Sequence, residues 1–436
     1  MRKRIFLCVL AASLLIISIC PAFAGGGKEG AAESKTVTIW YMNAANYEGP
    51  YRELWSRFNK QYPDIKLELV ALGWSDFGPK LQAAFAGGTE PNVIEVPPTF
   101  VQDQIWSGKI AEVPQEVLSK DYIEKTFLPF TYKMWQKDGK QYGMPLNCYL
   151  PGSVVLYNQD VWKSAGVTPN ENWSWEEFMT NLKKLVVMED GKFKRRAFTY
   201  RLGNPVDIWF AWTFQLGGTL LTDDQTKSMV TSEPSKTAFQ TLVDIYTKYG
   251  LDDYKITPDL ANVVDGTLAS AVGASYMDGI RQANYPKSKE FGWFLLPAIK
   301  PGADKTWSAP ASFGRSVSKK GATKAAWTYF KFMQDPENLF YFDLNAGEPM
   351  PIWELNTRPE VKKLSPAIAS LLPVVKFGKY PGLIWDSQEW NTYLVEALDS
   401  VIIQGGAVDP ALAKLEQKVN EMITKNRTKW GLPTAK

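Results

Sequence analysis

Polar and aromatic side chains recur at positions that directly follow the predicted strands of this chain. Open α/β sheets bind their ligands beyond the carboxyl ends of the strands, so these loop positions are the candidates for binding. If the chain forms two lobes, both sets of loops face the cleft between them, a preferred place for small-molecule sites. The candidate binding residues are Asn43, Asn46, Trp74, Thr99, Asn147, Tyr149, Asp207, Trp209, Tyr276, Asp278, Glu348, Trp385, Asp386 and Trp390, with Phe100 and Met350 beside them.

These residue types share a chemistry. Carboxylate and amide oxygens accept hydrogen bonds from hydroxyl groups, and amide nitrogens donate them back. Flat aromatic rings cover an apolar C–H face and tolerate a wet cleft, because one end of Tyr and Trp is polar. A ring with hydroxyls around its rim and apolar faces needs both kinds of side chain. The set therefore favours a polyhydroxylated ligand, and each polar group placed would reject a ligand that lacks the matching hydroxyl.

Several candidates have a structural alternative. Trp209 lies in an aromatic-rich run at 204–212 (NPVDIWFAW), and most aromatic residues in such a run are core. Asp207 could cap the helix that it precedes. Asp278 stands beside a glycine and could be a turn residue. Trp74 could be a partly exposed packing residue. The set as a whole is more specific than any one member.

The composition excludes several classes of function. The chain of 436 residues contains no histidine, which excludes histidine-dependent catalytic triads and histidine-ligated metal sites. Carboxylate chemistry stays open. Arg2, Lys3 and Arg4 are three of the 49 basic residues, so 46 remain beyond them against 46 acidic residues. The apparent net charge of +3 therefore does not indicate a nucleic-acid partner.

The first 24 residues are predicted to be a signal peptide. The three basic residues precede an apolar run at 5–20, and Ala22-Phe23-Ala24 supplies the small-x-small cleavage pattern. A retained membrane anchor and a lipid attached at Cys20 are the alternatives. Residues 25–35 (GGGKEGAAESK) are expected to be a flexible lead-in. We expect an exported protein in the periplasm or another extracytoplasmic compartment.

Cysteine usage leaves no disulfide in the mature chain. Two of the three cysteines, Cys8 and Cys20, lie in the signal peptide, and Cys148 is then alone. A nucleophilic thiol would need an activating base, so we expect Cys148 to be buried near the junction of two lobes. The 412 residues after position 24 are enough for about two lobes with ordinary cores.

Hydrophobic periodicity predicts an α/β fold, because short alternating strands are separated by amphipathic helices. In the first part, strands are expected at 37–42, 65–69 and 92–96, and helices at 50–62 and 79–86. In the later part, strands are expected at 154–157, within 265–276 and at 291–297, helices from Trp175, at 234–249 and at 323–334, and a polar loop at 189–196.

The stretch at 142–185 (YGMPLNCYLPGSVVLYNQDVWKSAGVTPNENWSWEEFMTNLKKL) carries the most specific pattern. Ser174 and Glu177 have the spacing of a capping box, and Trp173 and Phe178 occupy the flanking staple positions. The stretch resembles the Y-G-x-P…Y-N-x-D…A-G…T/S-W-x-E signature of family 1 extracellular solute-binding proteins, the sugar receptors of ABC importers. The resemblance extends from residue 37 to about 425 and is strongest at 86–98, 142–185 and 321–351.

The resemblance implies a two-lobed α/β fold of type II, in which each lobe is an open, mostly parallel sheet flanked by helices. The N-terminal lobe would comprise 36–147 plus 295–343 and the C-terminal lobe 148–294 plus 344–436. Three chain crossings near 147–152, 293–299 and 340–350 would form a hinge. By resemblance to maltose-binding members of the family, Tyr276 and Trp390 would present stacking rings.

The function that the resemblance implies is capture of a sugar or short oligosaccharide for an ABC permease, by a monomer that is not an enzyme and uses no cofactor or metal. One alternative keeps the fold but binds an anionic ligand or a peptide; only Arg201 and Arg281 lie near the candidate segments. A glycoside hydrolase could pair Asp207, Asp278, Asp386 or Glu389. A sensor kinase could replace the permease as partner.

Overall fold

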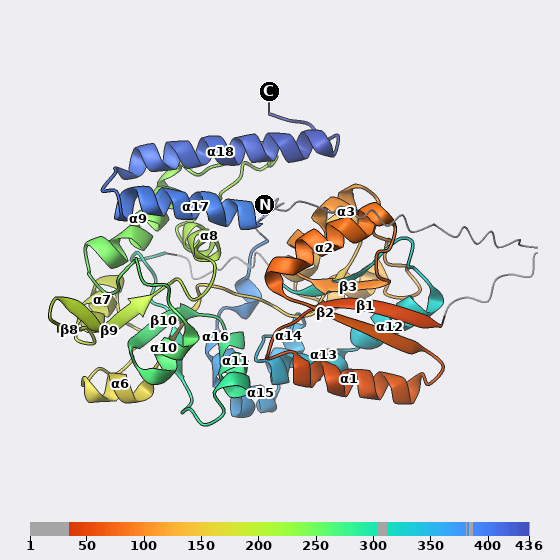
Figure 1. Cartoon of the computed structure of the whole chain (residues 1–436), viewed down its shortest axis with the longest axis horizontal. Helices are drawn as coiled ribbons and strands as arrows, with labels where there is room; N and C mark the ends of the chain where they lie inside the picture. Colours follow the sequence, from red (N-terminus) through yellow and green to blue (C-terminus); the bar gives the residue numbers. More distant parts are fainter. Residues whose placement is uncertain (1–34, 304–311, 381, 383–386, 436) are drawn as a thin grey trace, which may run out of the picture. The chain divides into compact units, whose positions relative to one another are not determined.

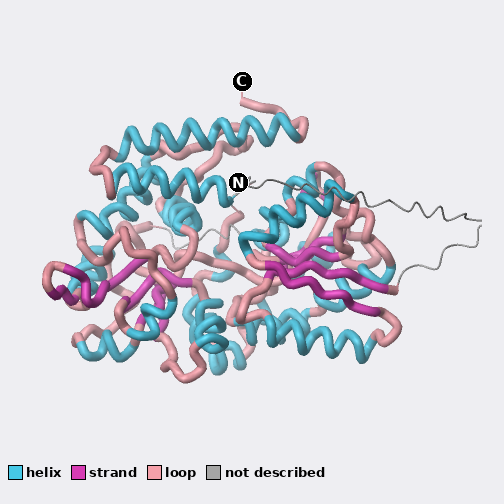
Figure 2. Tube along the Cα trace, in the orientation of Figure 1, coloured by secondary structure: helices cyan, strands magenta, loops and turns pink. Residues whose placement is uncertain are grey.

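The computed structural model describes residues 35–303, 312–380, 382 and 387–435. The described residues form two five-stranded sheets, each flanked by helices (Figures 1 and 2). We call the elements packed around the first sheet the first lobe and those around the second sheet the second lobe. The predicted signal peptide and Cys20 lie outside the described residues.

The first sheet has the strand order β2-β1-β3-β12-β6. Its strands are β1 (Thr36–Met42), β2 (Lys66–Leu72), β3 (Val93–Val96), β6 (Met144–Pro145) and β12 (Gly314–Val317). β1 pairs in parallel with β2 and β3, and β12 is antiparallel to β3 and β6, so four of the five strands point the same way. The three strands expected at 37–42, 65–69 and 92–96 are all present.

Helices cover both faces of the first sheet. On one face lie α1 (Glu48–Gln61), α12 (Lys324–Met333) and α13 (Pro336–Ala346), and on the other α2 (Trp74–Gly87) and α3 (Gln102–Trp106) (Figure 1). Alternation along β1 explains this, because Val37 and Ile39 enter the α1-side core. α2 starts five residues before the predicted Pro79, because a further turn from Trp74 precedes the proline.

The second sheet has the order β11-β7-β10-β9-β8. Its strands are β7 (Val154–Tyr157), β8 (Val187–Glu189), β9 (Lys192–Thr199), β10 (Leu268–Gly273) and β11 (Gly292–Leu295). Only β9 and β10 pair in parallel, but β11 points the same way as both, so three of the five strands share a direction. The predicted polar loop at 189–196 is wrong. Residues 192–196 belong to β9, and only Asp190 and Gly191 form the turn of the β8–β9 hairpin; both have positive φ, as a two-residue hairpin turn requires.

Helices of the second lobe bury one large core. α8 (Pro205–Gln215), α9 (Glu233–Thr247), α17 (Ser387–Ile402) and α18 (Val408–Lys429) pack on one another beside the sheet.

α7 (Trp175–Lys183) begins as predicted. Ser174 Oγ accepts from the Glu177 backbone N–H at 3.3 Å, and Glu177 Oε2 accepts from the Ser174 N–H at 2.8 Å. The Trp173 and Phe178 rings stack with centroids 6.2 Å apart, which completes the staple.

The chain passes between the lobes along three connections. β6 and β7 flank the first, and β11 and β12 flank the second. α13 packs against α1, so the third connection begins at Gly347 and continues to α16 (Pro366–Leu371), which packs against β11. The lobe boundaries and the hinge stay predictions.

The remaining elements are η1 (Pro98–Phe100), α4 (Lys120–Thr126), α5 (Pro129–Tyr132), η2 (Lys133–Trp135), β4 (Gln136–Lys137), β5 (Lys140–Gln141), α6 (Gln159–Ser164), α10 (Leu260–Asp265), α11 (Tyr276–Asn284), α14 (Trp353–Asn356), α15 (Pro359–Leu364) and η3 (Val375–Phe377).

A buried ion pair ties β3 to β12. Arg315 Nε lies 2.9 Å from Glu95 Oε1, and the two side chains are 0% and 1% exposed. Tyr329 of α12 donates its hydroxyl to the same oxygen at 3.1 Å, and Arg315 Nη1 donates to the Met333 carbonyl. The pair therefore joins two strands and a helix in the interior of the first lobe.

Cys148 is fully buried, and burial raises the pKa of its thiol well above the usual range. A neutral, inaccessible thiol is a poor nucleophile. In the part of the chain that the structure describes, no helix is long and apolar enough to span a bilayer, and no cluster of His, Cys, Asp or Glu could hold a metal ion.

Candidate functional site

A pocket of about 520 Å³ lies between the lobes and receives side chains from both, and we call it the interlobe pocket. The first lobe supplies the loop after β1 and the start of α2, and the second lobe supplies the loop after β9 and the start of α11. Segments between the lobes add Tyr149, Phe313 and Glu348. The lining residues are Met42, Asn43, Ala44, Ala45, Asn46, Tyr47, Trp74, Tyr149, Leu202, Gly203, Asn204, Asp207, Tyr276, Ile280, Phe313 and Glu348.

Glu348 is a buried carboxyl on the first-lobe side of the interlobe pocket. It is 2% exposed, and its Oε1 accepts from the Tyr47 hydroxyl at 3.2 Å. Its Oε2 has no hydrogen-bond partner among the described residues. Burial raises the pKa of Glu348 to about 8, and the Tyr47 hydrogen bond opposes this shift. Glu348 is therefore a buried acid with an acceptor oxygen to spare.

Asp207 occupies the corresponding place on the second-lobe side, in the first turn of α8. It is 3% exposed, and the Tyr149 hydroxyl donates to its Oδ2 across a long 3.5 Å. Burial raises the pKa of Asp207 to about 7, with the Tyr149 and Asn204 side chains opposing the shift. The pocket thus holds one weakly partnered carboxyl on its first-lobe side and one on its second-lobe side.

Aromatic rings lie between these carboxyls. The Tyr149 and Tyr276 rings have centroids 5.9 Å apart at a tilt of 48°. Tyr276, Glu348 and Asp207 line the same pocket; burial raises the pKa of the Tyr276 hydroxyl, and the charges of both acids add to the shift. Trp74 faces the pocket from α2 and is held edge-on to Phe100 at 5.1 Å. Polar rims beside flat rings are the arrangement that a polyhydroxylated ring ligand requires.

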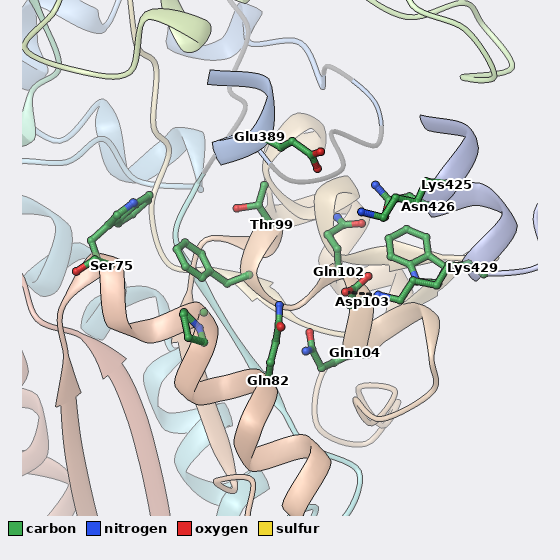
Figure 3. Close-up of a pocket in the computed structure, with 15 residues that line it drawn as sticks. Ser75, Gln82, Thr99, Gln102, Asp103, Gln104, Glu389, Lys425, Asn426 and Lys429 are labelled. Atoms are coloured by element: carbon green, nitrogen blue, oxygen red, sulfur yellow. Dashed lines mark hydrogen bonds and ion pairs between the residues drawn. The ribbon is translucent and has the colours of Figure 1, made fainter. Parts of the chain in front are cut away.

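A second pocket of about 670 Å³ adjoins the first, because Trp74 lines both. We call it the α18 pocket. In Figure 3, Thr99, Gln102 and Gln104 of the first lobe lie across the space from residues at the end of α18. Its polar lining residues are Ser75, Gln82, Thr99, Gln102, Asp103, Gln104, Glu389, Lys425, Asn426 and Lys429.

The end of α18 contacts the first lobe at one side of this pocket. Lys429 Nζ lies 2.6 Å from Asp103 Oδ2 of α3 (Figure 3). The Trp430 ring stacks on the Trp106 ring of α3 with centroids 5.6 Å apart and only 6° between planes. Lys137 Nζ lies 5.1 Å from the Trp106 centroid. We call this set the α3–α18 contact; it joins the lobes without lining the interlobe pocket.

Sequence comparison agrees with this architecture. The sequence pattern of bacterial extracellular solute-binding proteins matches residues 44–339, more than half of the chain. The chain belongs to this family. An arabinooligosaccharide-binding protein of Bacillus subtilis (strain 168) is 30% identical over 179 residues, 40% of this chain and 39% of that protein. A glycerol-3-phosphate-binding periplasmic protein of Pectobacterium atrosepticum is 27% identical over 165 residues, 36% of each chain.

The solved structure of the sugar-binding protein MalE from Xanthomonas citri superposes with a TM-score of 0.75 at 17% identity, covering 91% of this chain and 100% of that one. The likeness confirms the two-lobed type II fold. The chain spans less than half the length of the curated relatives that it matches. The relatives' ligands are therefore a matter for proposal.

Half of the predicted site residues of this solute-binding protein come together in the interlobe pocket. They are Asn43, Asn46, Trp74, Tyr149, Asp207, Tyr276 and Glu348. Thr99 and Phe100 line the α18 pocket instead, together with Trp74. The contribution of each to binding stays a prediction. Trp385 and Asp386 lie outside the described residues.

Trp209 and Trp390 are not in either pocket, which corrects their predicted placement. Both rings are fully buried in the core of the second lobe, 6.4 Å apart between centroids. Trp209 Nε1 donates to the Ser235 carbonyl at 3.0 Å, so its polar atom is also used there. Every residue of α8 is buried, so no polar face directs its aromatic residues towards the cleft.

Asn147, Asp278 and Met350 also lie away from the pocket surface. Asn147 is fully buried, donates to the Tyr47 hydroxyl at 3.0 Å and accepts from the Phe313 N–H at 2.9 Å. It therefore positions two lining residues from behind. Asp278 pairs with Arg281 at 2.8 Å within α11, and Met350 is core.

Sequence reasoning missed several lining residues. Tyr47 and Phe313 interact edge-to-face at 5.4 Å and form one wall. Leu202, Gly203 and Asn204 follow β9, so the rule that selected the other loops could have found them. The sequence predicts a polar loop at 189–196 in place of the β8–β9 hairpin, so it does not indicate where β9 ends.

Removal of the α3–α18 contact should change the balance between closed and open lobes. A stacked aromatic pair contributes about 0.5–1.5 kcal/mol beyond its buried area, and an exposed ion pair about 0–1 kcal/mol. We expect the Lys429→Ala, Trp430→Ala double variant to shift the balance between closed and open lobes about tenfold towards open. Small-angle scattering of the ligand-free protein should then give a larger radius of gyration. Lys418→Ala, which removes a pair within the second lobe, is the control. A profile that superimposes on the wild type would contradict this role.

Proposed function

We propose that this solute-binding protein captures a sugar or short oligosaccharide in the interlobe pocket and delivers it to an ABC importer. The composition of that pocket carries the proposal. Asn, Asp and Glu side chains offer partners for hydroxyls, and Trp74, Tyr149 and Tyr276 offer faces for a sugar ring. The arabinooligosaccharide-binding relative and the likeness to a sugar-binding MalE support the same ligand class.

The mechanism follows from the two-sided lining. A sugar that bonds to Glu348 and Asn43 on one side and to Asp207 on the other contacts both lobes only when they are close. Its affinity for the closed form then exceeds its affinity for the open form, and binding shifts the population towards closed. A membrane permease can distinguish closed from open, so closure is the signal that the protein delivers. We propose no catalytic step.

Export is part of the proposal. The basic and apolar N-terminal segment and its cleavage pattern support secretion of the chain past the cytoplasmic membrane. We propose that the mature protein works as a monomer, uses no cofactor, and meets its permease partner at the outer face of that membrane. A sugar receptor of this kind needs only its ligand and its permease.

A thermal-shift screen of the purified mature protein against neutral mono- and oligosaccharides tests the ligand class. A ligand at 100 times its Kd stabilises the folded form by about 2.7 kcal/mol, so its melting temperature should rise by several degrees. Calorimetry should give one site per chain, and the saccharide should be recovered intact, whereas a hydrolase would release products. Tyr276→Ala should remove the shift, and Tyr341→Ala, whose ring packs against Arg57 on α1, should keep it. If no saccharide shifts the melting temperature, the proposal fails.

A further inference from the structure

The described lining of the interlobe pocket contains acidic side chains but no basic ones. Its described lining includes two carboxyls, Glu348 and Asp207, and neither lysine nor arginine. The arginines of neighbouring elements are engaged elsewhere. Arg281 pairs with Asp278, Arg201 donates to the carbonyl of Tyr254, and Arg315 pairs with Glu95. None of these three guanidinium groups lines the pocket.

More negative charge lies behind Glu348. Asp343 is fully buried, and neither of its carboxyl oxygens has a hydrogen-bond partner within the described ranges. Burial raises the pKa of Asp343 well above its usual range, the charge of Glu348 adds to the shift, and Arg315 opposes it. The region therefore holds three carboxyls, including Glu95, for one buried guanidinium group.

Helix N-termini could in principle attract an anion to this pocket, because their N–H groups and dipoles favour negative charge. Four helices begin at lining residues: α1 after Tyr47, α2 at Trp74, α8 after Asn204 and α11 at Tyr276. Each of the four already carries an acid in its first turn. These acids are Glu48, Asp76, Asp207 and Asp278. An anion bound at any of these N-termini would therefore lie beside an acid of the same helix, although Glu48, Asp76 and Asp278 are also paired with Arg52, Lys80 and Arg281 of their own helices.

We propose that the interlobe pocket selects its ligand by charge, accepting neutral saccharides and excluding those that carry a phosphate or carboxylate, with Glu348 and Asp207 as the residues that set this selectivity. This inference rests on the proposed function and narrows its ligand class. Hydroxyl groups of a neutral sugar can donate to Glu348 Oε2 and to Asp207, which otherwise have too few donors. An anionic group offers only acceptors, and at a pH where both carboxyls are ionised it adds a third like charge to a desolvated site.

The lining of the interlobe pocket also differs from that of an anion-binding site. A phosphate or carboxylate site needs Arg, Lys or unneutralised helix N-termini aimed at the ligand. Among the described lining residues, only neutral donors such as Asn43, Asn46 and Asn204 could meet an anion. A phosphorylated ligand, such as the one in the name of the glycerol-3-phosphate-binding relative, would therefore have no charged partner here.

Competition calorimetry at about pH 8.5 tests the selectivity. The neutral saccharide with the largest thermal shift is compared with its counterpart oxidised to a carboxylate at one terminal hydroxymethyl group, and with glycerol 3-phosphate. We expect both anions to bind roughly 100-fold more weakly or worse, which corresponds to about 2.7 kcal/mol. An anion that binds as tightly as the neutral saccharide would overturn the inference and leave the proposed function standing. Failure of every saccharide would instead remove the proposed function.

Two further measurements assign the selectivity to the two carboxyls. In the Glu348→Gln, Asp207→Asn double variant the ratio of neutral to anionic affinity should fall at least roughly tenfold, about 1.4 kcal/mol. Asp121→Asn, an exposed acid of α4, should leave the ratio unchanged. If the double variant binds no ligand, the wild type at about pH 5.5 replaces it, because protonation of both carboxyls should shrink the same ratio. An unchanged ratio in both experiments would show that other groups exclude anions.

Discussion

Raising the pH from about 5.5 to 8.5 should destabilise the ligand-free protein. The folded-state pKa values of Glu348 and Asp207 are about 8 and about 7, against ordinary values of 4.5 and 3.8. Between the ordinary and the raised pKa of each group, the folded protein binds more protons than the unfolded chain. Unfolding then releases protons, so the free energy of unfolding decreases as the pH rises through this window.

The size of this effect follows from the proton linkage. For each pH unit over which one group is protonated only in the folded state, the free energy of unfolding falls by about 1.4 kcal/mol. Between pH 5.5 and 8.5 this window spans about 2.5 pH units for Glu348 and about 1.5 for Asp207, so together the two carboxyls should lower the free energy of unfolding by on the order of 5 kcal/mol. The groups that face them are Tyr47 and Asp343 around Glu348, and Tyr149, Tyr276 and Asn204 around Asp207. Asp343 acts in the same direction, because its pKa is also raised.

Urea unfolding at several pH values measures the prediction. The Glu348→Gln, Asp207→Asn variant should show a flatter profile than the wild type, with the slope from Asp343 remaining. Asp121→Asn should keep the wild-type slope, because Asp121 is exposed. A saturating neutral saccharide should also flatten the profile, since hydroxyl donors stabilise the ionised carboxylates. A wild-type stability that is constant or rises over this range would show that the two carboxyls are ionised in the ligand-free protein.

Local signals allowed much of the fold to be predicted from the sequence. The capping box and staple at Trp173–Phe178 use residues next to each other in the chain, and such local patterns keep their meaning whatever packs around them. The strands of the first lobe are short alternating runs between clear turns. The β8–β9 hairpin was missed because its residues are charged and exposed at the tip, although Asp190-Gly191 is a recognisable turn pair.

The pocket was predictable to the extent that it follows strand ends. Asn43, Asn46 and Tyr276 satisfy that rule and line the pocket. Trp209 does not line the pocket. Its helix α8 is buried on all sides, so periodicity cannot show which of its aromatic residues turns to the cleft. Glu348 lies after a helix, where the left-handed Gly347 (φ 79°) turns the chain towards the pocket. The lack of basic residues in the lining depends on which side chains meet, and only the structure shows it.

Replacing Glu95 by Gln should destabilise the protein by about 3–5 kcal/mol, because the change leaves Arg315 charged, buried and without its carboxylate. The geometry makes relaxation difficult. Arg315 and Glu95 are opposite each other in the β12–β3 register, and the guanidinium group has no route to water because its side chain is 0% exposed. Glu53→Gln, which breaks the exposed Arg57–Glu53 pair on α1, should cost at most about 1 kcal/mol.

A second variant separates the loss of the pair from the loss of packing. The Glu95→Met, Arg315→Met double variant removes both charges and keeps most of the volume, so it should recover most of the stability that Glu95→Gln loses. Denaturant unfolding of the wild type, Glu95→Met, Arg315→Met and the double variant gives the coupling between the sites. Because neither residue lines the interlobe pocket, saccharide affinity should stay within a few-fold of wild type wherever the variant is folded. Equal stability of Glu95→Gln and wild type would mean that the ion pair contributes nothing to the first lobe, and that Tyr329 and the β3–β12 ladder hold these elements together by themselves.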